Sequence, residues 1–337
     1  MLHRNLDSFL FPELDWIQVE VSSFCNAACI YCPHTIYHDR WVDRHMSLGT
    51  FERLRSVFHK TRLVYLQGWG EPLLNPNFFT FAEIAKKAGC RVGTTTNGTL
   101  LDGETICRIL DVDLDIIALS LASTDDRNDT IRKGTSIKKV IDTIRALGNA
   151  KAKAGTDKPS IHRAYILLRS YKNAAEALPS FLQDLDISHV AISTLDFVQD
   201  SEFQKEVLFP ETEEEYHTLR SYLDEISLAG QHNNINISYH LGHAGHRHLT
   251  CTENIQKALF ISADGTVSPC VFTHIPVSDH SPLMRSGKAY EHMIFGNINS
   301  QPLEEIWRRK AYRDFRNSFR RDMPHARCST CYKLYET

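Results

Sequence analysis

A regular alternation of strand-like and helix-like segments from residue 14 to residue 198 constrains the fold more than any other feature of the sequence. The strand-like runs are rich in β-branched residues, and the segments between them carry apolar residues at helical spacing. The six predicted strands are Asp15–Phe24, Arg62–Trp69, Cys90–Thr96, Asp115–Ala122, Ile161–Leu168 and His189–Phe197. The predicted helices between them are Ser47–His59, Asn77–Ala88, Gly103–Leu110, Ser136–Leu147 and Ala174–Leu185. Repeated β/α units predict an α/β fold with a parallel sheet, here a partial (β/α)6 TIM-like barrel with its chemistry on the loops after the strands.

The pattern changes after residue 200. An acidic helix is predicted at Glu211–Ala229 and a short strand at Ile235–Tyr239. Residues Ala258–Cys270 predict a hairpin, because Asp264-Gly265 supplies the positive φ that tight hairpin turns need. A last helix is predicted at Leu303–Phe319. The expected units are a barrel, a linker with a helix, and a smaller C-terminal auxiliary domain of hairpin plus helix, at residues 14–200, 201–250 and 251–337.

Composition excludes several classes of protein. The chain has 337 residues, of which 42% are apolar and 23% charged, as in ordinary globular proteins. The most apolar stretch, Asp115–Ser123, is about half the ~20 residues that cross a bilayer, and the first sixteen residues lack a secretory signal pattern. We therefore expect a cytoplasmic protein without a membrane partner. The net charge of −3 gives no reason to expect a polyanionic partner such as nucleic acid.

Nine cysteines without an export signal indicate metal ligands rather than a disulfide framework. Three of them, Cys25, Cys29 and Cys32, form C-x3-C-x2-C directly after the first predicted strand. Three thiolates this close can hold three corners of a [4Fe–4S] cube, which takes four protein ligands when fully bound, and so leave one iron open. The alternatives are ordinary buried cysteines or part of a zinc site.

This cluster resembles the radical S-adenosylmethionine (SAM) superfamily, whose motif has an aromatic residue before the third cysteine, here Tyr31. The sequence Gly68-Trp69-Gly70-Glu71-Pro72 after the second strand is similar to the family's glycine-rich element, whose backbone and glutamate hold the methionyl amino group. Gly70 and Glu71 match that element, whereas Trp69 departs from its commonest form.

Three further positions match the family in chain order. Asn97 after the third strand and Ser120 at the end of the fourth resemble residues that line the ribose and carboxylate of SAM. Arg132 resembles the arginine that pairs with that carboxylate. Each taken alone is also an ordinary turn residue, core serine or solvated arginine. The resemblance implies that SAM is cleaved reductively to methionine and a 5′-deoxyadenosyl radical, which removes a hydrogen atom from a substrate.

The second cysteine set is Cys251, Cys270, Cys328 and Cys331, in the order C-x13-G-x4-C and, after a gap, C-x2-C. Four thiolates suit either tetrahedral zinc or a [4Fe–4S] cluster, and spacing alone does not separate them. The arrangement resembles the SPASM/twitch extension of radical SAM enzymes. This chain lacks the additional cysteines of the longer SPASM version, so the resemblance implies one auxiliary cluster with four protein ligands.

A fully ligated cluster is suited to electron transfer. We therefore expect a two-electron oxidation (dehydrogenation) of a small molecule or peptide side chain, with the auxiliary cluster as electron acceptor and a flavodoxin or ferredoxin as electron donor to the enzyme. The rivals are a redox-neutral epimerase or rearrangement and a peptide-modifying maturase. A zinc-stabilised nucleic-acid-binding module is supported only by the basic segment Trp307–Arg321, whose apolar residues instead predict a helix packed on the core.

Polar residues on the later strands are candidates for the substrate cavity. Arg163, Tyr165 and Asp196 are expected to line it and to supply the base that oxidation of an alcohol needs, although they are also compatible with solvent-exposed strand ends. Other residues have less specific interpretations. The histidines 240, 243, 246 and 248 are predicted to lie in a solvated linker, and Cys90 and Cys107 in the core.

Overall fold

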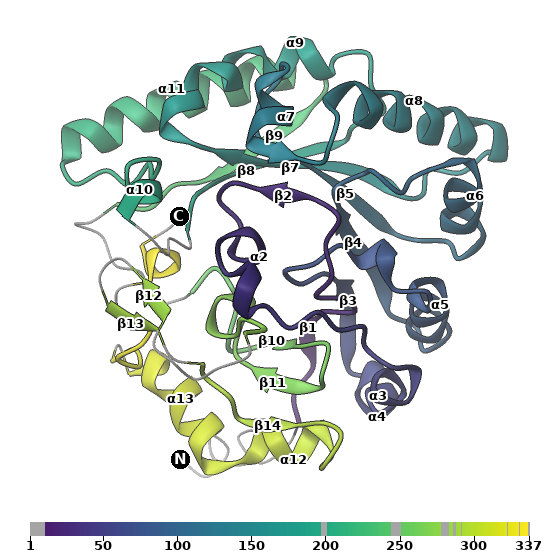
Figure 1. Cartoon of the computed structure of the whole chain (residues 1–337), viewed down its shortest axis with the longest axis vertical. Helices are drawn as coiled ribbons and strands as arrows, with labels where there is room; N and C mark the ends of the chain where they lie inside the picture. The colour runs from purple at the N-terminus through teal and green to yellow at the C-terminus, as the bar shows by residue number, and fades with distance from the viewer. Residues whose placement is uncertain are drawn as a thin grey trace.

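The computed structural model describes residues 11–196, 201–243, 251–277, 283–285, 288–290, 292–321, 323–329 and 331–335. Within these residues, the central feature is a curved ten-stranded sheet with eight parallel strands, seven of which come from residues 14–240 (Figure 1). In spatial order these seven are β1 (Leu14–Val19), β3 (Thr61–Leu66), β4 (Arg91–Thr96), β5 (Ile116–Leu121), β7 (Ser160–Leu167), β8 (His189–Thr194) and β9 (Asn236–His240). The first six correspond to the six predicted strands, so the predicted succession of parallel β/α units is confirmed. The predicted end of the sixth strand, Phe197, lies outside the described residues.

Helices cover the outer face of this sheet (Figure 1). They are α3 (Leu48–Glu52), α4 (Arg55–Phe58), α5 (Phe78–Lys87), α6 (Gly103–Asp111), α7 (Arg127–Ile131), α8 (Ile137–Ala154), the 3-10 helix η3 (Arg169–Ala177), α9 (Leu178–Leu182) and α11 (Glu213–His232). Several begin at polar residues whose side chains accept the first free backbone N–H groups. Ser47 accepts from Thr50 before α3, and Thr212 and Glu215 form a capping box on α11.

Alternation of side chains along each strand separates two environments. On β7 the outward residues Ile161, Tyr165 and Leu167 are buried in the core that packs against the helices. The inward residues face the hollow of the sheet, where the loop carrying β2 (Ala28–Cys29) and α2 (Pro33–Ile36) lies (Figure 1). The loops after the strands therefore meet around one central space.

The predicted C-terminal hairpin continues the barrel sheet. β10 (Ala258–Ile261) pairs parallel with β1, and β11 (Thr266–Ser268) and β14 (Gly296–Asn297) follow antiparallel. Gly265 has a φ of +85°, as the predicted turn requires. Because β10 pairs with β1, the segment after the hairpin is brought to the edge of the first cysteine loop.

The last predicted helix is two helices, α12 (Leu303–Arg308) and α13 (Lys310–Arg320), separated by the extended residue Arg309. Trp307, Tyr312 and Phe315 are at most 3% exposed, which confirms a core-packed helix face. The remaining short elements are α10 (Ser201–Gln204), β6 (Arg132–Lys133), β12 (Leu283–Arg285), β13 (Lys288–Tyr290) and the 3-10 helices η1 (His38–Arg40), η2 (Pro72–Leu74), η4 (Val271–Thr273) and η5 (Tyr332–Leu334).

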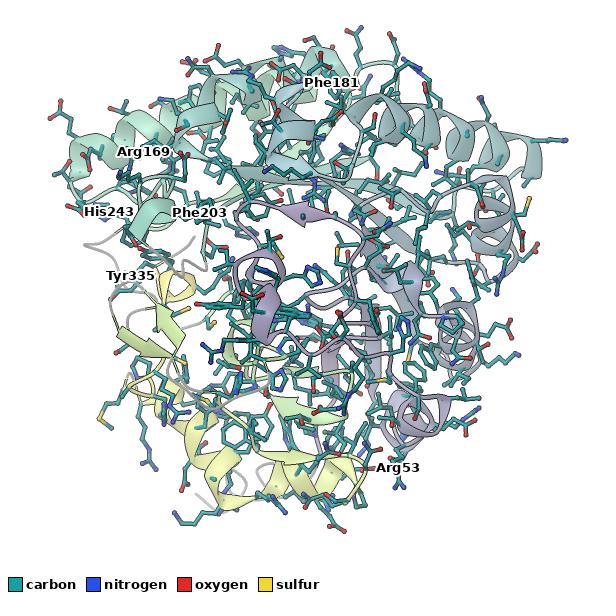
Figure 2. The ribbon with its side chains drawn as sticks, viewed as in Figure 1. Arg53, Arg169, Phe181, Phe203, His243 and Tyr335 are labelled. Carbon is teal, nitrogen blue, oxygen red and sulfur yellow. The ribbon has the colours of Figure 1, made fainter. Side chains whose placement is uncertain are left out.

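The expectations for His243 and for Cys107 are wrong. His243 is only 5% exposed and packs on Tyr216, with ring centroids 4.9 Å apart, so it is not part of a solvated linker. His243 lies near Tyr335 (Figure 2), and its backbone N–H donates to the carbonyl of Tyr335, 3.1 Å away. Histidines 246 and 248 lie outside the described residues. Cys90 is buried as expected, whereas Cys107 is exposed because it lies on the outer side of α6.

In the described part of the chain, no helix combines the length and apolar character needed to span a bilayer.

Candidate active site

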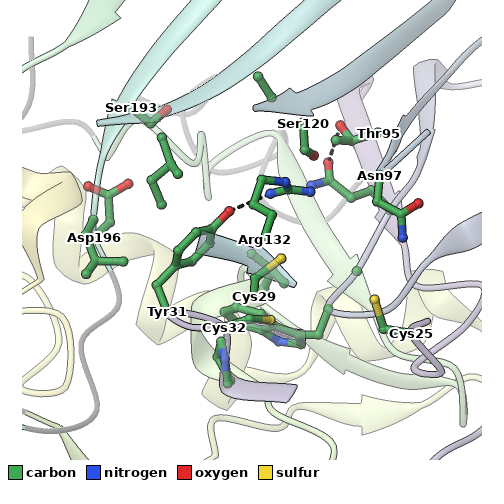
Figure 3. Close-up of a pocket in the computed structure, with 18 of the residues that line it drawn as sticks. Cys25, Cys29, Tyr31, Cys32, Thr95, Asn97, Ser120, Arg132, Ser193 and Asp196 are labelled. Carbon is green, nitrogen blue, oxygen red and sulfur yellow. Dashed lines mark hydrogen bonds between the residues drawn. The ribbon is translucent and has the colours of Figure 1, made fainter. Parts of the chain in front are cut away.

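The first cysteine cluster lies in the loop between β1 and β3. Cys29 is in β2, which pairs antiparallel with β6 so that Cys29 is opposite Arg132. Cys32 precedes α2, and its backbone N–H donates to the carbonyl of Cys29 at 3.0 Å. Cys25, Cys29 and Cys32 line a cavity of about 450 Å³ at the carboxyl ends of the strands (Figure 3). The structure thus brings the three thiols to one side of a common cavity.

Glu71 is fixed at the wall of this cavity. It is 2% exposed, and its carboxylate accepts hydrogen bonds from the Thr96 hydroxyl and the Asn97 N–H, both at 2.7 Å. Burial raises its pKa, and these hydrogen bonds partly oppose that effect. Gly70 precedes it in close contact with backbone, since a Cβ there would lie 2.4 Å from the carbonyl oxygens of Ser22 and Phe24. This explains on steric grounds why a glycine stands there.

The next two strands contribute Asn97 and Ser120. Asn97 follows β4, and its side chain donates to Asn26 at 2.8 Å and accepts from Thr99. Ser120 is the penultimate residue of β5 and lines the same cavity (Figure 3).

Arg132 reaches the cavity from β6 and is only 6% exposed. Its Nη1 donates to the hydroxyl of Tyr31 at 2.5 Å (Figure 3). Its buried Nε has no hydrogen-bond partner within the described residues. A buried guanidinium with a free donor is suited to a carboxylate ligand.

The second cysteine set comes from three separate segments: the start of the 251–257 loop, the end of the hairpin, and the last turn before η5. Cys251, Cys270, Cys328 and Cys331 nevertheless line one small cavity of about 30 Å³ with the rings of Phe315 and Phe319. The hairpin supplies Cys270 as the sequence predicts.

The chemistry of both sets favours metal ligation. Burial raises the pKa of Cys25 to about 11 and holds the pKa of Cys270 well above its ordinary value. These thiols would be protonated alone, and a bound metal is what stabilises such thiolates. No group of three His, Cys, Asp or Glu in the described ranges is close enough to hold a single metal ion, and each cysteine set lines a cavity instead.

A wall of three side chains separates the two cavities. Glu253, Phe272 and Lys333 line both of them. Lys333 also forms a buried ion pair with Asp196, with 2.7 Å between Nζ and Oδ2. Asp196 follows β8 and lies at the cavity, as expected from the sequence (Figure 3).

The expectation for Arg163 is wrong. Arg163 is opposite Leu119 on β5 and Val190 on β8, and it is fully buried on the outer face of the sheet. Burial, followed by the charge of Arg132, lowers its pKa to about 9. Its inward neighbour Ala164 lines the cavity instead. Neighbouring residues on a strand face opposite sides of the sheet, and the sequence alone does not tell which side of β7 faces the cavity.

Tyr165 has the same parity as Arg163. It contributes to the cavity wall but is only 1% exposed, and its hydroxyl has no hydrogen-bond partner among the described residues. Of the residues selected from sequence, the cavity brings together all except Arg163 and the second cysteine set: Cys25, Cys29, Tyr31, Cys32, Gly70, Glu71, Asn97, Ser120, Arg132, Tyr165 and Asp196.

Two protein-family profiles match this chain. The profile of the Radical SAM superfamily matches residues 19–163, and that of the SPASM iron–sulfur cluster-binding domain matches residues 251–332. The chain is a radical SAM enzyme with a C-terminal SPASM domain. It therefore uses SAM and two [4Fe–4S] clusters. The zinc interpretations are wrong, because the C-terminal cysteines belong to an iron–sulfur family.

Individual relatives agree with this assignment. The radical SAM chain is 24% identical over 321 residues to the tungsten-containing aldehyde ferredoxin oxidoreductase cofactor-modifying protein of Pyrococcus furiosus, covering 90% of this chain and 83% of that protein. Among solved structures, anSMEcpe with bound AdoMet is similar with a TM-score of 0.67 and 17% identity, over 95% of this chain and 87% of that one. SuiB of Streptococcus suis bound to S-adenosylmethionine has a TM-score of 0.63 and 13% identity, over 96% and 72%. At these identities the two solved structures establish the fold.

The sequence patterns do not single out the wall residues. Lys333 lies two residues after Cys331, and Glu253 two residues after Cys251. A charged residue two positions after a predicted cysteine ligand indicates a side chain near the cluster. The spacing does not tell which cavity that side chain faces.

Proposed function

We propose that this radical SAM enzyme dehydrogenates a small polar molecule, with the auxiliary cluster accepting the second electron. The observation that carries the proposal is the wall of Glu253, Phe272 and Lys333, which lines both cavities. A substrate in the larger cavity is thereby separated from the cysteines of the second set by one layer of side chains. Such proximity favours transfer of an electron from a substrate radical to the auxiliary cluster.

The residues of the larger cavity have complementary roles in this proposal. Cys25, Cys29 and Cys32 would hold the first cluster, while Cys251, Cys270, Cys328 and Cys331 would hold the second. The carboxylate of Glu71 and the guanidinium of Arg132 would bind the amino and carboxylate groups of SAM, because each is buried at the cavity wall with the opposite charge. When bound, SAM and the first cluster would supply a 5′-deoxyadenosyl radical that removes a hydrogen atom, and the oxidised second cluster would take one electron.

Asp196 would accept the proton in the same reaction. Oxidation of an alcohol or amine carbon loses one hydrogen atom, one electron and one proton. The Asp196 carboxylate lies at the cavity, 2.7 Å from the ammonium of Lys333. Lys333 in this scheme orients Asp196, and the Thr194 hydroxyl donates to Asp196 Oδ1 at 3.1 Å.

The relatives favour a small molecule over a peptide as substrate. The Pyrococcus furiosus relative is named as a cofactor-modifying protein, and it matches over most of both chains. A peptide-modifying reaction is the second candidate, because the fold is also that of SuiB, which has been solved with a precursor peptide. The electron donor, proposed to be a flavodoxin or ferredoxin, and the cytoplasmic location belong to the same proposal.

The test is an anaerobic incubation of the loaded enzyme with SAM, a reductant and candidate substrates deuterated at the target carbon. Dehydrogenation predicts deuterium in 5′-deoxyadenosine and a product two hydrogens lighter. A product of unchanged composition with deuterium in 5′-deoxyadenosine would instead establish a redox-neutral reaction.

Two variants test separate parts of the proposal: the auxiliary cluster as electron acceptor and Asp196 as base. Cys270→Ala should lose the dehydrogenated product while still forming 5′-deoxyadenosine, because only the second set is altered. If Cys270→Ala forms the oxidised product at the wild-type rate, the auxiliary cluster is not the electron acceptor. Asp196→Asn should slow product formation but leave the binding of SAM unchanged.

A further inference from the structure

Trp69 lies between two glycines whose surroundings leave no space for a side chain. A Cβ at Gly68 would lie 2.3 Å from the Glu20 side chain, and one at Gly70 would meet backbone carbonyls. Trp69 between them is half-buried and lines the larger cavity. The departure from the commonest family sequence thus places a large side chain where its neighbours allow none.

The Trp69 side chain contacts the segment that follows Cys270. Its indole Nε1 donates to the carbonyl of His274 at 2.7 Å. Its ring meets Phe272 edge-to-face, with centroids 6.1 Å apart. Phe272 is one of the three wall residues, so the contact runs from the glycine-rich loop to the boundary between the two cavities.

A second connection runs through the backbone of Trp69. Its N–H donates to Glu20 Oε1 at 2.9 Å, and Glu20 Oε2 accepts from the N–H of Ala263 at 3.3 Å. Ala263 is in the turn of the hairpin that carries Cys270. Glu20 is completely buried, so solvent does not compete for these hydrogen bonds.

These contacts belong to a small hydrophobic cluster apart from the barrel core. Its members come from the segment after Cys32, the glycine-rich loop and the segment after Cys270: Tyr37, Trp41, Trp69, Phe272, Ile275 and Val277. Backbone pairing supports it, since Val42 N–H donates to the carbonyl of Pro276 at 2.8 Å. Three segments that serve different cofactors therefore share one packed unit.

We propose that Trp69 is a positioning residue that couples the glycine-rich loop to residues 271–277, so that binding of SAM fixes the Phe272 wall between the two cavities. The coupling rests on the proposed role of the Gly68–Pro72 loop in SAM binding and goes beyond it, because it links that loop to the auxiliary-cluster segment. Linkage requires the effect to be reciprocal, so loosening this segment weakens SAM binding.

Hydrogen–deuterium exchange of the loaded enzyme, with and without SAM and under anaerobic conditions, tests the coupling. In the wild type, SAM should slow exchange of the amides in residues 271–277. In Trp69→Phe, which keeps a ring and removes the indole donor, that SAM-dependent slowing should be lost. The dissociation constant of SAM, measured by equilibrium dialysis, should rise about fivefold, the value of one hydrogen bond of about 1 kcal/mol.

Trp41→Phe is the matched control. Trp41 lies in the same cluster, but its indole donates to Ser23, 2.9 Å away, and not to residues 271–277. The SAM response of residues 271–277 should survive in this variant. The coupling is refuted if SAM leaves exchange in 271–277 unchanged in the wild type, or if Trp69→Phe responds as the wild type does.

A separate variant distinguishes failure of the site from failure of the coupling. Glu71→Gln should weaken SAM binding without changing the contacts of Trp69. If Glu71→Gln binds SAM as tightly as the wild type, the glycine-rich loop does not hold SAM and the proposed site itself is wrong, and the coupling falls with it.

Discussion

The ammonium of Lys333 lies 2.7 Å from the carboxylate of Asp196, and both side chains are less than a tenth exposed. Asp196 follows the sixth barrel strand, whereas Lys333 belongs to the turn after the final cysteine. The pair therefore joins the SPASM region to the barrel at the cavity. Burial of two charges is favourable only when they remain together.

Removal of one partner should cost stability. Lys333→Met leaves the Asp196 carboxylate buried without its cation, and we expect the free energy of unfolding to fall by about 3–5 kcal/mol. The double variant Asp196→Leu, Lys333→Met should recover part of that loss, because the Asp196 carboxylate is no longer buried without its cation. Urea unfolding of the anaerobically loaded protein measures both.

The exposed pair Lys87–Glu83 provides the control for this prediction. Its charges are 3.0 Å apart, but the side chains are 76% and 49% exposed. Lys87→Met should change the free energy of unfolding by less than about 1 kcal/mol. Equal effects of Lys333→Met and Lys87→Met would mean that the buried pair adds nothing to stability.

Gly70 should not tolerate a methyl group. In Gly70→Ala, the new Cβ would lie 2.4 Å from two backbone carbonyls, and the loop must shift. We expect a loss of roughly 1–3 kcal/mol in stability and weaker SAM binding, because Glu71 follows directly. Gly103→Ala, with open space around its Cβ, should be neutral or more stable by up to about 1 kcal/mol. Thermal unfolding and equilibrium dialysis compare the two, and similar behaviour of both variants would contradict the steric argument.

Cys29→Ala should remove the first cluster and leave the second in place. We expect iron to fall from about eight to about four atoms per chain and 5′-deoxyadenosine formation to stop, because only the first cluster is lost. Cys107→Ala is the control, since Cys107 is an exposed thiol outside both cavities. Iron analysis and chromatography of the nucleoside products measure the result. Continued cleavage of SAM by Cys29→Ala would remove the first cluster from the mechanism.

Glu20 predicts a pH-dependent stability. Burial, opposed by its hydrogen bonds to Trp69 and Ala263, raises the pKa of Glu20 from 4.5 to about 7, with nearby Asp264 adding to the rise. As pH increases from about 4.5 to 7, the unfolded chain releases this proton first, so the folded state loses stability over that window. The loss is about 3 kcal/mol and constant above pH 7.

The variant Glu20→Gln has no carboxyl group to titrate at this position. The wild type should lose stability relative to Glu20→Gln between pH 5 and pH 7.5, as measured by urea unfolding at each pH. Other titrating groups cancel in this difference. Parallel curves for the two proteins would show that Glu20 is ionised throughout.

Local sequence determined the secondary-structure elements, one turn and the family of this protein. Strand and helix periodicity specified the six β/α units, because burial of one face imposes a period on each element. Asp264-Gly265 specified the hairpin turn, because few other dipeptides adopt its backbone angles. The cysteine spacings pointed to the family that the sequence profiles identify.

Tertiary structure decided what periodicity leaves ambiguous. Alternation along β7 allows Arg163 or Ala164 to face the cavity, and only pairing with β5 and β8 places Arg163 outside. The ion pair of Asp196 with Lys333 and the contact of Trp69 with His274 join residues far apart in the chain. Such contacts arise when the hairpin pairs with β1 and the C-terminal turn closes on the cavity. Their free energies depend on burial and on mutual approach, and a linear pattern of residue types contains neither.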